Sequence, residues 1–406
     1  MLLKIAFRNI FRHKRRSFLT ALAMFGGFIL ASFFIGMADG TYNQVIDIFT
    51  RTNLGHIQIH GDGYLDKPSL YNTIDDYEAI GEKAAGIEGV EAWTPRILSG
   101  GLVSVGDKTY GASIRGIDPA KEDGAMNFSG KLVEGELIAN EAGSGVLLGK
   151  GLAKILKTGV GDSVVIVSQA ADGSIANDIY PIKGFVELGD DMSDRTTMFM
   201  NLVDAQELFV LQGRVHEIVI LVENIKGVRP ISGRIKETLN REELDVEPWQ
   251  EFAKSFYQAM QADKQGNYIT QFIIMLIVAV GVLNTVLMSV LERTREYGVM
   301  KAIGTKPVHI FFLIILEVLL LASVSMVIGS GMGMLVNYLF ARAEISMPGG
   351  MQFDIGGMEI KHWTAEITAS SVYFPAITVF LSALLVSIFP ALRAAKTSPA
   401  KTMRAF

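Results

Sequence analysis

The sequence of 406 residues contains no cysteine, which excludes disulfide bonds, thiolate nucleophiles and thiolate metal sites. The catalytic patterns Gly-x-Ser-x-Gly and His-Glu-x-x-His are also absent. The segment GSGVLLGKGLAKI resembles a phosphate-binding loop, but Ser144 stands where that pattern needs glycine and Gly151 where it needs serine or threonine. His56 and His60 share a strand face without a third ligand nearby, so they do not predict a metal site. The sequence therefore indicates a non-catalytic chain with no metal or cofactor of its own.

Acidic residues are missing from the first 16 positions and are scarce in two other short segments. These three segments together hold 14 basic residues against 2 acidic ones, whereas the whole chain has 37 basic and 42 acidic residues. Basic flanks of membrane spans stay in the cytoplasm and favour anionic lipid head groups. Because topology explains these basic residues, a nucleic-acid partner is not predicted. The segments are residues 1–16, 292–309 and 393–406.

Half of the residues are hydrophobic, and they are concentrated in runs that are long enough to cross a bilayer. The first run is longer than the apolar region of a signal peptide and ends in GMADG without a small-x-small cleavage site. We therefore interpret it as an uncleaved span of an integral membrane protein. The predicted spans are Phe18–Ala38, Tyr268–Leu291, Ile310–Phe340 and Val372–Leu392.

The predicted fold class is a membrane α-helical protein with four transmembrane helices and a large extracytoplasmic domain with α/β and β parts. The other predicted segments are a cytoplasmic amphipathic helix within 1–17, the extracytoplasmic domain 39–267, a cytoplasmic helix within 292–309, an extracytoplasmic loop 341–371 and a cytoplasmic tail 393–406. Both termini are predicted to be cytoplasmic.

The large domain alternates strand and helix patterns, which predicts two subdomains. An α/β subdomain is expected at about 53–116 and 214–248, and a β-rich subdomain at about 117–213. Helical spacing of apolar residues also continues beyond the first span, in TYNQVIDIFTR, and precedes the second, in EPWQEFAKSFYQAM. These two segments predict either a stalk that extends the spans or two separate surface helices.

Glu317 lies inside the third predicted span, where an isolated carboxylate is costly. It is expected either to pair with a basic residue near the cytoplasmic face or to be protonated, and a structural role is favoured over ion transport. Gly329 and Gly333 in the same span form a Gly-x-x-x-Gly pattern, which allows another helix to approach closely.

The segment LERTREYGVMKAIGTKPVHI separates the second and third spans. Its charged and apolar residues, followed by Gly304 as a helix terminator, predict a short helix that docks on a partner. The alternative is an ordinary basic loop, which would not need paired glutamates or an ordered stop. The predicted docking residues are Glu292, Arg293, Arg295, Glu296, Val299, Met300, Lys301 and Ile303.

Three segments together resemble a known family. ERTREYGVMKAIGTKPVHIFFLIILE resembles the E-R-x-x-E-[IY]-G-x-[LM]-[KR]-A-[IL]-G core of FtsX-like permeases, the four-span subunits of ABC transporters of the MacB and LolC/LolE type. FPALRAAKTSPAKTMR resembles their C-terminal motif, and AFRNIFRHKRRSFLT their N-terminal segment. The opening of the outer domain looks closer to the lipoprotein-releasing permeases LolC and LolE, and the chain lacks the fused ATPase of MacB.

The resemblance implies a MacB-like periplasmic core domain and a coupling helix seated on a separate cytoplasmic ABC ATPase, which binds ATP and Mg²⁺. It implies two ATPases, a second permease that is identical or homologous, membrane lipid, and a periplasmic lipoprotein chaperone or adaptor. The implied function is mechanotransmission that extracts lipoproteins from the outer leaflet of a bacterial inner membrane. Two alternatives stay open: a MacB-like permease that exports peptides or drugs with an adaptor and outer-membrane channel, and an FtsX-like regulator of a cell-wall hydrolase.

Substrate contacts are expected on the outer halves of the first two spans. The residues predicted for these contacts are Phe33, Phe34, Phe272 and Met275.

Overall fold

The computed structural model describes residues 2–12, 14–343, 345–346, 353–355, 358–360 and 362–397. The chain divides into two compact units. We call the first, residues 1–44, 260–350 and 361–406, the helical unit, and the second, residues 45–259 and 351–360, the α/β unit.

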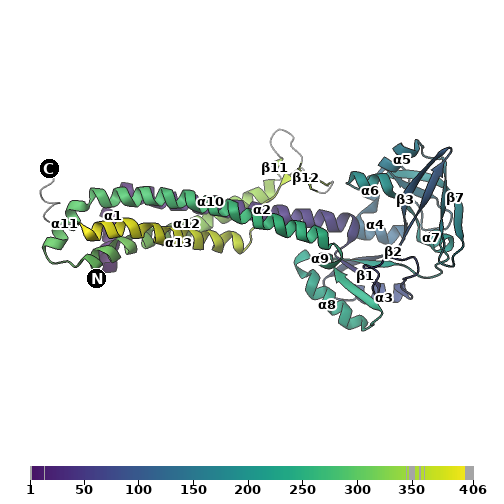
Figure 1. Ribbon diagram of the computed structural model, residues 1–406, viewed down its shortest axis with the longest axis horizontal. Coiled ribbons are helices and arrows are strands. Elements are labelled where there is room, and N and C mark those ends of the chain that lie inside the picture. Colours follow the sequence, from purple (N-terminus) through teal and green to yellow (C-terminus); the bar gives the residue numbers. More distant parts are fainter. Residues whose placement is uncertain are drawn as a thin grey trace. The chain divides into compact units, whose positions relative to one another are not determined.

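Long apolar helices make up most of the helical unit (Figure 1). Among the described residues, four helices are long and apolar enough to cross a membrane, and each contains one predicted span. The helices are α1 (Leu2–Arg12), α2 (Lys14–Phe49), α10 (Lys254–Glu292), α11 (Thr294–Ala302), α12 (Pro307–Ala343) and α13 (Ser370–Lys396). The second half of the predicted loop 341–371 contains the short strands β12 (Phe353–Ile355), β13 (Met358–Ile360) and β14 (His362–Trp363), and β14 pairs with β11 (Ile345–Ser346).

Small residues let α2 and α12 approach each other closely. A Cβ atom added at Gly333 would lie 2.8 Å from the hydroxyl oxygen of Ser32, and one at Gly329 would lie 3.1 Å from the ring of Phe28. The Asn337 side chain also donates a hydrogen bond to the backbone carbonyl of Ser32 at 3.2 Å. The predicted Gly-x-x-x-Gly contact is therefore present, and its partner is the first span.

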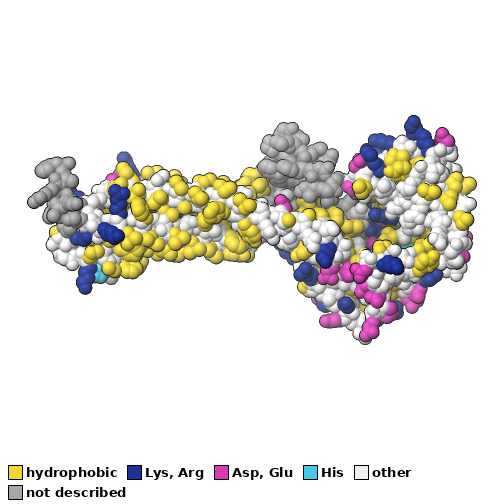
Figure 2. Space-filling model, viewed as in Figure 1, with side chains coloured by type: hydrophobic (Ala, Val, Ile, Leu, Met, Phe, Trp, Pro, Cys, Tyr) yellow, Lys and Arg dark blue, Asp and Glu magenta, His cyan; other side chains and the backbone are white. Residues whose placement is uncertain are grey.

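Helix α1 has three distinct faces. Ala6 is buried against the bundle, whereas Leu3, Phe7 and Phe11 are exposed on a neighbouring stripe. Its basic residues form a third stripe, and exposed Lys and Arg side chains gather at the end of the helical unit that holds α11 (Figure 2). This pattern suits a helix that lies at a membrane interface. It ends at Arg12, so the predicted 1–17 segment already includes the start of α2.

The α/β unit is built on strands with short helices packed around them (Figure 1). The strands are β1 (Ile57–Gly61), β2 (Val90–Val105), β3 (Lys108–Ile117), β4 (Leu132–Gly135), β5 (Val146–Gly149), β6 (Ser163–Gln169), β7 (Ile175–Val186), β8 (Thr197–Asn201), β9 (Glu217–Val222) and β10 (Leu244–Pro248). The helical elements are η1 (Thr50–Leu54), α3 (Tyr77–Ala85), α4 (Pro119–Met126), η2 (Phe128–Lys131), α5 (Lys150–Leu156), α6 (Asp191–Thr196), α7 (Leu202–Leu208), η3 (Ile225–Gly227), α8 (Val228–Leu239) and α9 (Trp249–Phe252).

The strand pairing closes a ring in one half of this unit. β2 pairs with β3, β3 with β8, β8 with β5, β5 with β7, β7 with β6, and β6 returns to β2. Closure satisfies the edges that an open sheet would leave exposed. Alternate residues of these strands, such as Val164 and Ile166 on β6 and Met198 and Met200 on β8, fill the interior.

The predicted division into two subdomains needs one correction. Residues 117–213 do not form the ring alone, because β2 and β3 supply two of its strands. The first part of β2, Val90–Arg96, pairs with β9, while Leu102–Ser104 pairs with β6. One 16-residue strand therefore belongs to both parts and joins them into one hydrogen-bonded sheet.

The segments predicted as a stalk are continuous with the apolar helices. α2 runs without interruption to Phe49, and α10 begins at Lys254. Within the α/β unit, the rings of Phe49 and Phe256 stack with centroids 3.8 Å apart. Within the helical unit, the Tyr42 hydroxyl donates to a carboxylate oxygen of Asp263 at 2.6 Å. The two helices thus pack on each other in both units.

Candidate functional site

Helix α11 lies between α10 and α12 and has defined ends. The backbone turns out of the helical region at Arg293, where φ is −98° and ψ is 8°. At the other end, Thr305 N–H donates to the Met300 carbonyl at 2.9 Å and Gly304 N–H donates to the Lys301 carbonyl at 3.1 Å, with Gly304 at φ +98°. This pair of bonds is a Schellman motif, which needs a residue that tolerates positive φ. The predicted termination at Gly304 is confirmed.

Arg293 holds the start of this helix to α12. Its Nη1 atom lies 3.2 and 3.1 Å from the two carboxylate oxygens of Glu317, and its Nε atom donates to Glu296 Oε2 at 2.9 Å. Arg293 is only 5% exposed, and its guanidinium lies 5.4 Å from the ring centroid of the buried Tyr297. Of the two states expected for Glu317, the structure contains the ion pair. A buried pair of this kind is costly to break because the remaining charge would have no partner.

Lys301 holds the other end of α11 to α13. Its ammonium donates hydrogen bonds to the carbonyl oxygens of Ala395 and Thr397, both at 2.7 Å. These acceptors lie at the C-terminal end of α13, where the helix leaves carbonyl groups without helical partners and carries partial negative charge. The short helix is thereby attached to two membrane helices.

The structure corrects the predicted direction of two of these side chains. Arg293 and Lys301 were expected to face a partner, but both face the bundle, with Tyr297 between them at four-residue spacing. Residues four apart lie on one face of a helix, so these three positions form the inner face of α11. Met300 also packs on the bundle core.

The remaining residues form an outer face. Val299 is 47% exposed and Ile303 is 79% exposed, and Glu292 and Arg295 are exposed beside them. Val308, at the start of α12, is also 59% exposed. Sequence reasoning missed Val308 and Tyr297; the four-residue spacing of Arg293, Tyr297 and Lys301 was the available signal for the inner face.

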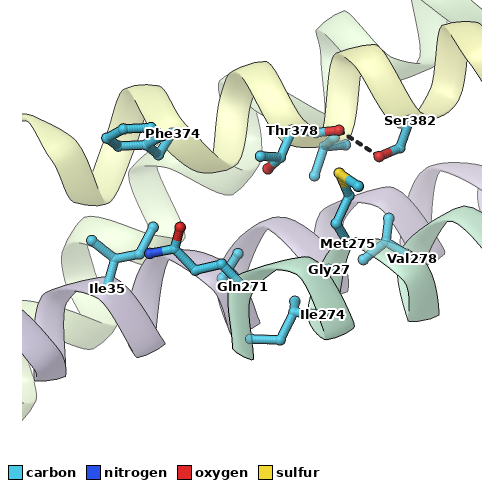
Figure 3. A pocket seen from close by; sticks show the side chains of 11 residues that line it. Gly27, Ile35, Gln271, Ile274, Met275, Val278, Phe374, Thr378 and Ser382 are labelled. Carbon is cyan, nitrogen blue, oxygen red and sulfur yellow. Dashed lines mark hydrogen bonds between the residues drawn. The ribbon is translucent and has the colours of Figure 1, made fainter. Parts of the chain in front are cut away.

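The four predicted substrate-contact residues do not form one cluster. Met275 lines a small cavity between α2, α10 and α13, together with Gly27, Gln271 and Thr378 (Figure 3). Phe272 is exposed on the outside of α10, and the Phe33 ring packs edge-on against Phe340 with centroids 4.6 Å apart. Phe34 is half-buried. Figure 3 shows Met275 pointing toward the turn of α13 in which Ser382 Oγ donates to the Thr378 carbonyl at 2.6 Å.

The histidines of the α/β unit bind backbone groups. His56 Nδ1 accepts a hydrogen bond from Val222 N–H at 2.9 Å, and His60 Nδ1 lies 3.1 Å from the His216 carbonyl oxygen. Within the described residues, no group of three His, Asp or Glu side chains is placed to hold a metal ion.

Comparison with known proteins covers most of the chain. Residues 17–237 match the MacB-like periplasmic core domain, and residues 268–399 match the FtsX-like permease C-terminal domain, which includes α11. The lipoprotein-releasing system transmembrane protein LolC of Neisseria meningitidis serogroup B is 20% identical over 87% of this chain and 86% of its own length. The macrolide export ATP-binding/permease protein MacB of Haemophilus ducreyi is 23% identical over 97% of this chain and 54% of that longer protein.

Among solved structures, the periplasmic region of MacB from Actinobacillus actinomycetemcomitans is similar to this chain with a TM-score of 0.37 and 15% identity, over 50% of this chain and 93% of that one. The two matched domains together account for most of the apolar helices, the helix between the second and third of them, and most of the α/β unit. The chain belongs to the family of FtsX-like permeases that carry a MacB-like periplasmic core domain, and it is a permease of the LolC/MacB type.

Proposed function

We propose that this chain is the permease subunit of a mechanotransmission-type ABC transporter that extracts lipoproteins from the outer leaflet of a bacterial inner membrane. Both termini and α11 are then cytoplasmic, and the α/β unit is periplasmic. A separate ATPase, present in two copies, binds ATP and Mg²⁺ and performs the hydrolysis. A second permease, identical or homologous, completes the membrane part, and a periplasmic lipoprotein chaperone or adaptor receives the cargo.

The two faces of α11 are the observation that carries the ATPase-docking part. The inner face is attached to α12 through Arg293 and to α13 through Lys301. The outer face presents Val299 and Ile303 as an apolar surface beside charged groups. A partner that pushes on this surface moves two membrane helices with it, because hydrogen-bonded ion pairs and buried side chains resist independent motion.

The lipoprotein part is supported by the LolC relatives and by the composition of the helical surface. Phe272 lies among exposed apolar side chains of α10, and Met275 lines the cavity beside α2 and α13. Acyl chains of a lipoprotein gain free energy from such apolar contacts, while the polar amide of Gln271 suits a lipid ester group.

Ile303→Glu tests the docking surface. A carboxylate at this position would have to be desolvated in an apolar interface, so the ATPase should no longer co-purify with the permease. Ile175→Glu is the matched control, because Ile175 in the α/β unit is 78% exposed and Ile303 is 79% exposed. Equal ATPase recovery with both variants would overturn the docking proposal.

Substrate class is tested in proteoliposomes that contain the permease, its ATPase and a triacylated lipoprotein. ATP-dependent transfer of the lipoprotein to a soluble acceptor is expected, and its absence would contradict the extraction proposal. The second candidate, export of peptides or macrolides, is favoured by the alignment of MacB relatives over 97% of the chain. Drug or peptide export that depends on this permease, without lipoprotein release, would select that alternative.

A further inference from the structure

The end of α2 is an unusual helix terminus. After Phe49 the chain forms the π-helical turn η1, in which Gly55 N–H donates to the Thr50 carbonyl at 2.7 Å. Gly55, with φ +80°, ends the turn and leads the chain into β1. π-Helical turns are rare and often occur at functional positions. The last carbonyl groups of such a terminus need hydrogen-bond donors from elsewhere in the protein.

Three cations from separate elements bind this terminus. Arg96 of β2 donates from Nη1 to the Asn53 carbonyl at 2.7 Å, and Arg115 of β3 donates from Nη1 to Asn53 Oδ1 at 2.6 Å. Lys131 of η2 donates from Nζ to the Thr52 carbonyl. All of these residues belong to the α/β unit.

Two buried carboxylates organise the cations. Arg96 Nη2 lies 2.6 Å from Glu122 Oε1, and Arg96 Nη1 lies 3.4 Å from Glu217 Oε1. Arg96 is 3% exposed and Glu122 is 2% exposed. Burial raises the pKa of the Glu122 carboxyl, but the charge of Arg96 and its hydrogen bonds outweigh burial and hold that pKa below its ordinary value. Burial lowers the pKa of Lys131 to about 8.

The charges of this cluster do not cancel without the helix. Arg96, Arg115 and Lys131 carry three positive charges against the two carboxylates of Glu122 and Glu217. A helix C-terminus carries roughly half a negative charge, so η1 supplies about half of the missing compensation. Withdrawing η1 would remove the acceptors of Arg115 and Lys131, both half-buried, and would leave Arg96 with its two carboxylates alone.

The attachment of α10 is built differently. α9 and α10 are separated by a break at Ala253, where φ is −102° and ψ is 44°. On either side, aromatic rings make the contacts: Trp249 lies 6.1 Å from Phe256 and 5.6 Å from Tyr257 between ring centroids. Ring contacts of this kind are weaker than charge-assisted hydrogen bonds, so they resist rotation of α10 less than the cations resist motion of η1.

We propose that Arg96, Arg115 and Lys131 are positioning residues that make the end of α2 a rigid joint with the α/β unit, whereas Ala253 is a hinge for α10. This inference rests on the proposed transporter function, because it assigns the transmission of displacement to α2. The aromatic contact between Phe49 and Phe256 then lets α10 turn against a fixed α2.

Spin labels test the joint directly in the full-length permease bound to its ATPase in nanodiscs. The chain has no cysteine, so Ile48→Cys with Asp107→Cys reports on α2 against the sheet, and Gln258→Cys with Asp107→Cys reports on α10. We expect the first pair to give one narrow distance distribution that is the same with and without ATP. The second pair should shift its distance with ATP. A shift in the first pair, or none in the second, would overturn the inference.

Variants at the joint test whether these residues fix the position of η1 or only support folding. Asn53→Leu removes only the acceptor of Arg115 and should broaden the first distribution, as should Arg115→Gln. Asn53→Asp keeps the acceptor and adds the missing negative charge, so it should stay narrow. Arg234→Gln, at an exposed arginine that donates to the Glu88 carbonyl, is the matched control and should also stay narrow. Narrow distributions in both Asn53→Leu and Arg115→Gln would refute the joint.

The nucleotide-free measurement keeps this inference separate from the proposed function. If no ATPase binds the permease, the transporter proposal fails, but the distances of the Asn53 and Arg115 variants still decide whether the cluster fixes η1. If the ATPase binds, Asn53→Leu should keep ATP hydrolysis while losing the ATP-dependent release of cargo. Unchanged release in that variant would show that α2 does not transmit displacement through this cluster.

Discussion

Two regions of this permease hold a helix end with charged side chains, but the balance of positive and negative groups is opposite in the two. At α11, one guanidinium, Arg293, faces two carboxylates, Glu296 and Glu317. At the end of α2, three cations face two carboxylates and a helix C-terminus. The first region leaves an outer helix face exposed, whereas the second binds its helix end from several elements. The proposed docking of a partner on α11 and the proposed fixed joint at η1 both rest on this contrast.

Arg96→Leu should have the largest effect on this contrast. The substitution leaves the buried carboxylates of Glu122 and Glu217 without their guanidinium partner. Removing one partner of a buried ion pair lowers the free energy of unfolding by about 3 to 5 kcal/mol. Amide hydrogen exchange of the full-length protein should show lower protection of η1 and β9 and little change in α12. Arg234→Leu, at an exposed arginine, is the control. Unchanged exchange in η1 would mean that Arg96 is not what holds the helix end.

Arg293→Leu should destabilise the helical unit by about 3 kcal/mol, because Glu317 would remain alone inside the bundle. The double variant Arg293→Leu/Glu317→Leu should recover most of that loss, since two apolar residues pack without an unpaired charge. Reversible unfolding in mixed micelles measures both values, with the exposed Arg295→Leu as the control. Additive losses in the double variant would show that the two side chains do not interact.

Lowering the pH should destabilise the α/β unit through His56 without a matching effect on α11. Burial lowers the pKa of His56 to about 4, so the folded protein resists a proton that the unfolded chain binds near the ordinary value of 6.5. Stability is therefore fully present above pH 6.5 and declines as the pH falls toward 4, by about 3 kcal/mol for this group. Exchange of the Val222 amide, which donates to His56, should accelerate over this range, while the amides of α11 should not respond to the protonation of His56. A His56→Gln variant should flatten the pH dependence at Val222; an unchanged profile would exclude His56 as its source.

Local patterns in the sequence were sufficient to predict structural features whose interacting residues lie close together in the chain. The helix stop at Gly304 follows from glycine tolerating positive φ, and the strands β1 and β9 follow from short apolar runs. The acidic residue at 317 required a basic partner, and Arg293 lies only 24 residues away. The sequence did not show that Arg293 faces the bundle, because its partner Glu317 lies on the next helix and no local spacing links the two.

No local sequence pattern predicts the charged cluster at η1. Arg96 and Glu217 are 121 residues apart, and Arg115 and Asn53 are 62 apart, so no spacing links them. Their proximity depends on β2 and β3 forming one hairpin that is shared by both parts of the sheet. The same sharing explains why the predicted boundary at residue 117 does not separate two independent subdomains.

By itself, the sequence determined the number of long apolar runs, the short helix between the second and third of them, and the membership in the FtsX-like permeases. These features depend on hydropathy, glycine stops and local motifs, and each of these is contained in a short segment of the chain. Only the tertiary structure decided which side chains of α11 face inward, which cation neutralises Glu317, and how the end of α2 is held. Those outcomes depend on buried charges finding partners across the fold, and the cost of an unpaired charge in the interior selects one arrangement that no local pattern contains.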